Sequence, residues 1–397
     1  MNISTPYFKE NNNDENYIPL AKPSITKKEI AYVNEAMING WGENKSKFIE
    51  KFELTFAKKI GAKFALATSS CTGALHLGLE SLGIKKGDEV IVPALSWSTT
   101  YHPLQQYGLK LKILDINIDT LNVDVEEIEK YITKKTKLIV AVGILGNPLN
   151  LKKLANICKK KNIYLMEDNC ETMGAKVGNK FTGTFGIVNT FSTFFSHHIS
   201  TMEGGVVTTN DNEIYNIILA LRSHGWTRDI EKKTFYLKKH QKRYEDYCFV
   251  LPGYNLRPTN LAAAIGCEQL RKINKMIAIR KKNHKYFQKL FKDDERFYCQ
   301  KLEFSGSSFA FTLILKKKYI KIKSKLYKKL KISNIEFRLI TGGSFFEHPV
   351  KKYFNFTNPN GRKNVTYLHK HGFFVGNHPK DLRKELDHLK KSIEGIQ

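Results

Sequence analysis

The chain lacks any long apolar run, which excludes an ordinary membrane-spanning helix. Such a helix needs roughly 18 consecutive apolar residues or more, and the longest apolar segment, Leu138–Leu145, falls well short. The first residues, Met1–Pro6, also lack the basic start and apolar stretch of a secretion signal. We therefore expect a cytoplasmic protein with no membrane partner. Its 397 residues are enough for one large domain and a smaller one.

Closely spaced cysteines are missing as well. The six cysteines are scattered, and no CxxC pair or histidine cluster gives the spacing of a zinc site. They are Cys71, Cys158, Cys170, Cys248, Cys267 and Cys299. We expect reduced thiols, no metal ion and no iron–sulfur cluster.

Acidic residues are scarce relative to basic ones. The chain has 65 lysines and arginines against 38 aspartates and glutamates, a formal net charge of +27. Such a charge favours a polyanionic partner, either nucleic acid or a nucleotide diphosphate, although lysine-rich solvent-exposed faces produce it too. Because no helix-turn-helix, finger or aromatic-basic motif accompanies the lysines, we do not expect nucleic acid as a partner.

What the sequence does contain is a regular alternation of short apolar strands and helices. The capping box at Thr26–Glu29 predicts a helix that ends near Gly40, and a second amphipathic helix is expected over 46–60. Further strands are expected at 64–67, 89–92, 109–115, 137–142, 163–167 and 206–209, with helices up to Leu82 and at 125–131, 151–160 and 213–222. This pattern predicts an α/β protein with a mostly parallel sheet covered on both faces.

Two domains are expected. Residues 1–275 form a large domain that begins with an extended arm at 1–15, and residues 276–397 form a smaller α+β domain. A helical pattern at 261–291 links the two. The smaller domain is expected to contain the segments 309–315, 319–330 and 336–339, and a last helix over 379–393.

Two segments follow predicted strands and carry candidate chemistry. The turn Ser69–Ala74 opens a helix, whose free N–H groups hold phosphates well, although serine and threonine are also ordinary helix caps. Asp168 ends a strand, at the edge of the sheet where ligands bind in α/β proteins. Its carboxylate can accept a hydrogen bond from a pyridinium N–H, while a helix cap or a surface ion pair is the alternative.

A third segment holds two adjacent histidines, His197 and His198, between an aromatic strand and the turn at Gly204–Gly205. An imidazole can take and return a proton within one catalytic cycle. A lone histidine is more often a packed, hydrogen-bonded residue, so the pair alone leaves both interpretations open.

Taken together and in this order, the three segments resemble the nucleotide-sugar aminotransferases of fold type I, the aspartate aminotransferase-like fold. The resemblance covers almost the whole chain, from about Ile18. It implies a three-layer large domain with a smaller C-terminal domain. It also implies pyridoxal 5′-phosphate and pyridoxamine 5′-phosphate as cofactor forms, and a homodimer with shared active sites.

The resemblance assigns cofactor contacts to particular residues. They are Ser70, Cys71, Thr72, Trp97, Asp168, Glu171, Ser192 and Asn255. In the family, the serine–threonine turn and the serine at 192 bind the phosphate, an aromatic residue stacks on the ring, and the strand-end carboxylate bonds the pyridine nitrogen. Asn255, in the motif Pro252–Arg257, would reach the phosphate of the neighbouring subunit.

His197 is the departure from the family. It stands where the family has the lysine that binds the cofactor covalently, and the nearest lysines, Lys180 and Lys232, lie outside the motif. An imidazole can move a proton but cannot replace that covalent bond. By resemblance, the substitution predicts the chemistry of the 3-dehydratases of dideoxysugar pathways. These enzymes use glutamate to remove the C3 hydroxyl of a nucleotide-linked 4-keto sugar and release 2-oxoglutarate and ammonia.

Further segments resemble the cluster-free dehydratases that act on GDP-linked 4-keto-6-deoxy sugars. On that resemblance, His224 would hold the glutamate carboxylate or shuttle a proton, and Phe249 would reach the partner's active site. Arg338 would bind glutamate or the sugar nucleotide, since its fork pairs with either anion. A fold-supporting hydrogen bond is the alternative for His224 and for Arg338. The sugar is a hexose of mannose configuration or a 6-deoxyheptose, which differ by too little for the sequence to separate them.

Two other functions stay open. One is a sugar aminotransferase in which another lysine serves, and the other is a catalytically silent binding protein that kept the fold. The retained Trp97, Asp168, Ser192 and Asn255 argue against a silent protein, because an idle cofactor site has no reason to keep all its parts.

Overall fold

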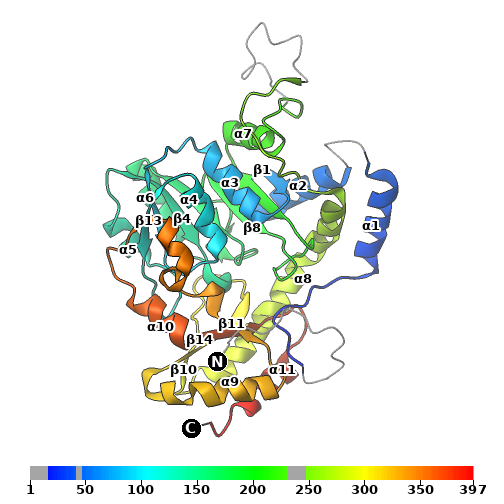
Figure 1. The fold of residues 1–397 in the computed structure, drawn as a ribbon. Helices are drawn as coiled ribbons and strands as arrows, with labels where there is room; N and C mark the ends of the chain where they lie inside the picture. Colours follow the sequence, from blue (N-terminus) through cyan, green and yellow to red (C-terminus); the bar gives the residue numbers. More distant parts are fainter. Residues whose placement is uncertain (1–16, 42–46, 231–246, 397) are drawn as a thin grey trace.

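The computed structural model describes residues 17–41, 47–230 and 247–396, and the arm expected at 1–15 lies outside them. A larger body is built on an eight-stranded sheet and a smaller one on a four-stranded sheet, with one long helix running between them (Figure 1). None of the helices in these ranges is long and apolar enough to cross a membrane.

The larger sheet has the strand order β1-β9-β8-β5-β4-β2-β3-β13. Neighbours from β8 to β13 are parallel, whereas β9 runs antiparallel to both its neighbours. The predicted mostly parallel sheet is therefore confirmed. Its strands are β1 Phe64–Thr68, β2 Glu89–Pro93, β3 Lys110–Leu114, β4 Thr136–Val142, β5 Tyr164–Asp168, β8 Val188–Ser192, β9 Gly205–Thr209 and β13 Asn355–Thr357.

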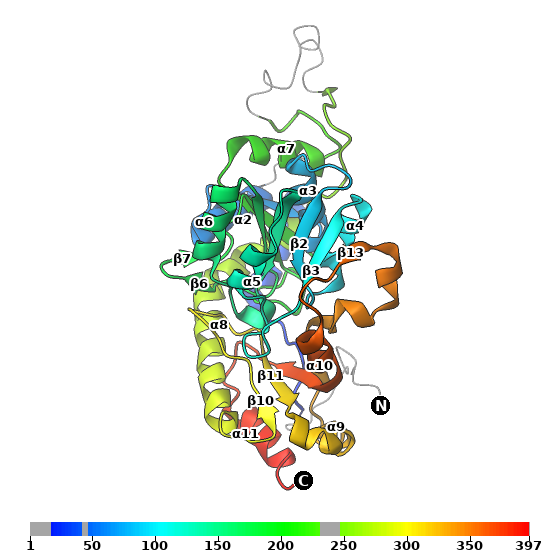
Figure 2. The same ribbon diagram turned by 90° about the vertical axis from the view of Figure 1, so that its left-hand side faces the viewer.

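Helices cover both faces of this sheet and complete three layers (Figure 2). On β1, Ala65 and Ala67 pack in one cluster with α2 and α8, while Leu66 between them packs in another with α3 and α7. The two-residue period of a strand produces this alternation. The helices are α1 Lys27–Asn39, α2 Lys47–Ile60, α3 Cys71–Ser81, α4 His102–Gln106, α5 Val125–Lys130, α6 Leu151–Lys161, α7 Asn212–Arg222 and α8 Asn260–Phe291, and a small hairpin joins β6 Lys176–Val177 to β7 Lys180–Phe181.

The smaller sheet is antiparallel, in the order β10-β11-β14-β12. Its elements are β10 Phe297–Tyr298, β11 Ala310–Leu315, α9 Lys323–Ile332, β12 Phe337–Arg338, α10 Lys363–His371, β14 Gly372–Gly376 and α11 Arg383–Ser392. The segment expected at 319–330 consists of part of a 3₁₀ segment, Lys317–Ile322, followed by part of α9. One expectation needs correction, because the last helix begins at Arg383 rather than at Pro379.

Helix α8 belongs to both bodies. Its first half buries Ala263, Leu270 and Ile277 in the cluster with α2, and its end buries Phe287 and Phe291 against the smaller sheet. The boundary expected near residue 275 falls inside this continuous helix. The division into 1–275 and 276–397 stays a prediction, and β13, which follows residue 275, pairs with β3 of the larger sheet.

Candidate active site

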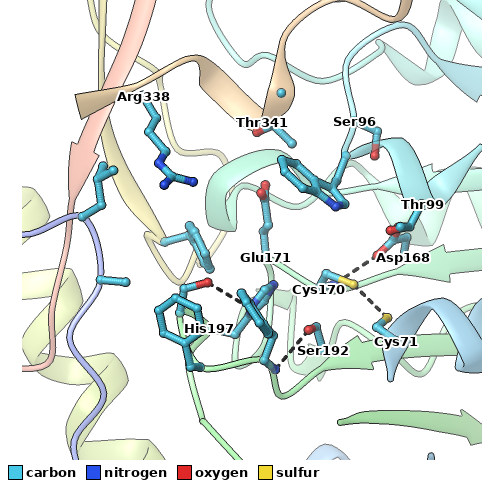
Figure 3. A pocket seen from close by; sticks show the side chains of 18 of the residues that line it. Cys71, Ser96, Thr99, Asp168, Cys170, Glu171, Ser192, His197, Arg338 and Thr341 are labelled. Atoms are coloured by element: carbon cyan, nitrogen blue, oxygen red, sulfur yellow. Dashed lines mark hydrogen bonds between the residues drawn. The ribbon is translucent and has the colours of Figure 1, made fainter. Parts of the chain in front are cut away.

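A cavity of about 360 Å³ opens where β4, β5 and β8 end, and the smaller sheet closes its other side (Figure 3). In parallel α/β sheets this carboxyl edge is where ligands bind. The cavity brings together most of the residues that the sequence singled out, namely Ser70, Cys71, Thr72, Trp97, Asp168, Glu171, Ser192, His197 and Arg338.

The serine–threonine turn lies at the N-terminus of α3. Ser70 caps the helix, because its Oγ accepts a hydrogen bond from the Gly73 N–H at 3.1 Å. The first N–H groups of a helix have no intrahelical acceptor, which makes this end of α3 suited to a phosphate. Gly205 of β9 lies directly against the turn, where a Cβ would come within 2.5 Å of the Ser70 carbonyl oxygen. Ser192, the other predicted phosphate ligand, is Gly205's neighbour on β8.

Asp168 is held rigidly beside the cavity and is 4% exposed. Thr100 donates its hydroxyl to Asp168 Oδ2 at 2.7 Å, and the Cys170 N–H donates to Oδ1 at 3.2 Å. The carboxylate therefore keeps one orientation and can accept a further hydrogen bond from a ring N–H. Thr100 was missed by the sequence argument, although it lies only three residues after Trp97.

Glu171 lies on the same edge of the sheet as Asp168, and its carboxyl group has a raised pKa. Burial, with a smaller contribution from the charge of Asp168, raises the pKa of Glu171 to about 7. The Leu145 N–H donates to Glu171 Oε2 at 2.7 Å, which opposes that shift. Glu171 thus changes protonation near neutral pH, a property shared by groups that transfer protons.

Two cysteines that are distant in the sequence meet beside Asp168. The Sγ atoms of Cys71 and Cys170 lie 2.9 Å apart (Figure 3). The contact with Cys71, together with burial, raises the pKa of the Cys170 thiol, so this thiol stays protonated. With Asp168 the two thiols form a compact group whose donor atoms lie within 4.8 Å of one another. Sequence spacing did not reveal this pair, because residues 71 and 170 come from different strand ends.

His197 lies in the loop between β8 and β9 and lines the cavity. Its ring packs edge-on against Phe309, with the ring centroids 5.4 Å apart. Burial, assisted by the positive charge of Arg280, lowers the pKa of His197 to about 4. The imidazole is therefore neutral at physiological pH and ready to accept a proton. His198, by contrast, is buried outside the cavity with its ring against Phe309.

The opposite wall comes from the smaller sheet and the N-terminal segment. Arg338 of β12 points its guanidinium into the cavity (Figure 3). Trp97 is 53% exposed and lines the same cavity. Residues on this side that the sequence argument missed are Lys22, Arg280, Phe309, Thr341, Asn377 and His378. One signal for Arg280 was available, because it interrupts the buried stripe of α8 between Ile277 and Phe287.

Three predicted site residues do not line this cavity. Asn255 accepts a hydrogen bond from Arg257 Nε at 3.0 Å and pairs with Ser223. Phe249 is 59% exposed and stacks on Trp226 with ring centroids 5.9 Å apart. His224 is exposed, with a left-handed φ of 64°. The structure of a single chain does not bring these residues to the site, and their roles stay predictions.

The residues that line the cavity fit pyridoxal phosphate, but the position where the family has its cofactor-binding lysine holds no lysine. A helix N-terminus suits the phosphate, and a buried, singly oriented carboxylate suits the pyridine nitrogen. Where a lysine is expected, the structure has the imidazole of His197. Within the described part of the chain, Lys22 is the lysine that lines the cavity, and it is an exposed residue of the N-terminal segment beside the smaller sheet.

Known proteins share this fold and much of this sequence. Residues 23–381 match the DegT/DnrJ/EryC1/StrS aminotransferase family. A GDP-4-keto-6-deoxy-D-mannose 3-dehydratase of Escherichia coli O55:H7 is 45% identical over 356 residues, which are 87% of this chain and 92% of that protein.

Two crystal structures are also similar to most of the chain. A GDP-4-keto-6-deoxymannose-3-dehydratase with a trapped PLP–glutamate geminal diamine has a TM-score of 0.90 at 43% identity, covering 95% of this chain and 100% of that one. A histidine-to-asparagine variant of an enzyme of the same name, with bound GDP-perosamine, has a TM-score of 0.90 at 42% identity and the same coverage. These similarities confirm the predicted fold type I architecture.

Proposed function

Because the chain belongs to the DegT/DnrJ/EryC1/StrS aminotransferase family, we propose that it removes the C3 hydroxyl of a GDP-linked 4-keto-6-deoxy sugar, using pyridoxal phosphate and glutamate. The products are a 4-keto-3,6-dideoxy sugar, 2-oxoglutarate and ammonia. One observation carries this proposal. His197, which stands where the resemblance expects the family's lysine, lines the cavity together with most of the side chains that we predict to hold the cofactor. The relative named above as a 3-dehydratase supports the choice of reaction.

The cofactor, when bound, supplies an electron sink that lets a bond beside the sugar's C4 carbon break. We assign its phosphate to the turn at Ser70, Cys71 and Thr72 and to Ser192 across Gly205. We assign its ring nitrogen to Asp168, which Thr100 keeps in position. Trp97 would cover the ring from the exposed side of the cavity.

His197 moves the proton in this proposal. Its lowered pKa, about 4, leaves the imidazole neutral, so that it can accept the proton whose removal expels the C3 hydroxyl. Phe309 packs against the ring and limits where the imidazole can lie. Since an imidazole cannot take the place of a lysine amine, residue 197 cannot supply the amine that completes amino transfer in the related aminotransferases.

We also propose a cytoplasmic homodimer in which Asn255, Phe249 and His224 complete the partner's cavity. Phe249 supports this assignment because it is a large apolar side chain that stays 59% exposed in the single chain. The three residues lie near one another, since the bridges Ser223–Asn255 and Trp226–Phe249 join their two segments.

The test is incubation of the purified protein with glutamate, pyridoxal phosphate and GDP-4-keto-6-deoxymannose. The expected result is release of ammonia and 2-oxoglutarate, together with a sugar nucleotide that has lost one oxygen by mass. A GDP-linked amino sugar would instead establish an aminotransferase, and no turnover with either the hexose or the 6-deoxyheptose substrate would contradict the proposal.

An aminotransferase is the second candidate, because Lys22 lines the cavity. Borohydride reduction of the loaded enzyme, followed by peptide mass spectrometry, separates the two functions. Cofactor covalently attached to Lys22 would contradict the dehydratase proposal and establish the aminotransferase. Cofactor that is released without a covalent bond to the protein would support the dehydratase.

A further inference from the structure

Arg280 is a buried cation for which the described chain supplies no anion. It lies on α8, is 4% exposed and lines the cavity. Every ion pair in the described residues joins other side chains, and none places a carboxylate within 4.0 Å of its guanidinium. Burial lowers the pKa of Arg280 only to about 10, so the side chain stays charged at neutral pH.

The hydrogen bonds of Arg280 satisfy only part of the guanidinium. Its Nη1 donates to the carbonyl of Phe309 at 3.0 Å and to the carbonyl of Asn377, while its Nε has no acceptor among the residues that the structure describes. Backbone carbonyls carry partial charges and do not neutralise a cation. An unpaired buried charge is strongly unfavourable, so its retention beside a cavity indicates an anionic ligand.

The positive charge of Arg280 also disfavours protonation of the histidines around it. Its charge contributes to the lowered pKa values of His197, His198 and His378, which are therefore neutral neighbours. Three carboxylates of the described chain line the cavity, those of Asp168, Glu171 and Glu203. Asp168 and Glu171 accept hydrogen bonds from Thr100 and from the Leu145 N–H, and none of the three forms an ion pair with Arg280. Among the described residues, the guanidinium therefore has no counter-ion in the cavity.

Three kinds of anion enter the proposed reaction: the cofactor phosphate, the GDP diphosphate and the carboxylates of glutamate. The phosphate has its own site at the N-terminus of α3, on the other wall. The diphosphate is large and strongly hydrated, and the more exposed cations Lys22 and Arg338 suit it better than a 4% exposed arginine. A planar carboxylate matches the planar fork of a single buried guanidinium.

We infer that Arg280 binds a carboxylate of L-glutamate and so selects the amino donor. This inference rests on the proposed function. It divides the arginines of the cavity between the two substrates, with Arg280 for glutamate and Arg338 for the sugar nucleotide. Arg280 is then a binding residue for the step that regenerates the amine form of the cofactor, and not for the dehydration step.

The test measures the two steps separately in the Arg280→Gln variant. Regeneration is followed by the absorbance change when glutamate is added to the enzyme loaded with pyridoxal phosphate. Dehydration is followed in a single turnover that starts from pyridoxamine phosphate and the GDP-4-keto sugar, without glutamate. We expect the half-saturating glutamate concentration to rise about 10- to 150-fold, as for loss of a charge-assisted hydrogen bond. The single turnover should stay within about threefold of wild type, since it needs no glutamate carboxylate.

Lys281→Gln is the matched control. It removes a positive charge from the next residue of α8, and Lys281 bonds Ser305 and does not line the cavity. Glutamine and isoglutamine identify which carboxylate is bound, because each replaces one carboxylate of glutamate by an amide. Wild type should discriminate strongly against one of the two amides, and Arg280→Gln should lose that discrimination while Arg280→Lys keeps part of it.

Unchanged glutamate saturation in Arg280→Gln would overturn the inference. Equal losses in both steps would do so too, because they would indicate that Arg280 only supports the fold through the Phe309 and Asn377 carbonyls. Failure of the proposed function is a separate result: wild type would then fail in the single turnover with pyridoxamine phosphate, whatever Arg280→Gln does with glutamate.

Discussion

A substitution at Gly205 can shift the phosphate turn without replacing any of the predicted ligand residues. Gly205 pairs with Thr68 on one side and with Ser192 on the other, so it lies between the two predicted phosphate-binding segments. In Gly205→Ala, the new Cβ would lie 2.5 Å from the Ser70 carbonyl oxygen and 2.6 Å from the Cys71 nitrogen. Both contacts are with backbone, so the start of α3 must move. Overpacking of this kind costs about 1–3 kcal/mol of stability.

We expect Gly205→Ala to weaken cofactor binding about 10- to 150-fold, the effect of losing one charge-assisted hydrogen bond to the phosphate. Equilibrium titration of the cofactor-free protein with pyridoxamine phosphate measures this affinity, and thermal unfolding measures the stability loss. Gly266→Ala is the matched control, because its Cβ would lie 2.5 Å from the Phe52 ring in a cluster away from the cavity. A better helix propensity offsets its cost by up to about 1 kcal/mol. If both variants bound the cofactor like wild type, the turn would not be the phosphate site.

Two further predictions concern histidines. His197→Asn should slow ammonia release at least about 100-fold, the usual contribution of a general base. Pyridoxamine phosphate should still bind to this variant in a fluorescence titration. Normal turnover in the variant would contradict the proton-transfer role of His197. His378 and His284 have pKa values lowered by burial to about 3 and about 4, so each of them binds more protons in the unfolded chain than in the folded one below pH 6.5. Each histidine should therefore lower the free energy of unfolding as the pH drops from about 6.5 towards 4, by up to about 1.4 kcal/mol per pH unit. Urea titrations at several pH values should show that His378→Asn removes the contribution of His378 from the slope seen in wild type.

The parts of the fold that were predicted correctly depend on local signals. The α1 helix begins at a capping box in which Thr26 and Glu29 bond each other's backbone and side chains, and it ends at Gly40. Each strand predicted for residues 64–209 is present, because a strand that is buried on both faces is a short apolar run bounded by turns. Both kinds of signal lie within a few neighbouring residues.

The parts that were missed depend on contacts between distant segments. Strand β13, Asn355–Thr357, has no apolar run of its own and exists because it pairs with Lys110–Lys112 of β3. Cys71 and Cys170 meet because the start of α3 and the end of β5 share one edge of the sheet. Arg280 was detectable as a cation in an apolar stripe, but the sequence does not show that it has no carboxylate partner among the described residues, because that depends on every neighbouring element.

Asn255 can serve either the cavity of its own chain or that of a partner subunit. Mixing two inactive variants distinguishes these two arrangements. We expect His197→Asn and Asn255→Asp each to be inactive, the second because a carboxylate would repel the cofactor phosphate. In a mixed dimer, if Asn255 serves the partner's cavity, one cavity carries both defects and the other carries none. Activity should then reappear after co-refolding or co-expression, at up to about half of the wild-type value per mixed dimer. If Asn255 acts within its own chain, each cavity keeps one defect and the mixture stays inactive. The single-chain geometry, in which Asn255 bonds Arg257 outside the cavity, favours the first outcome.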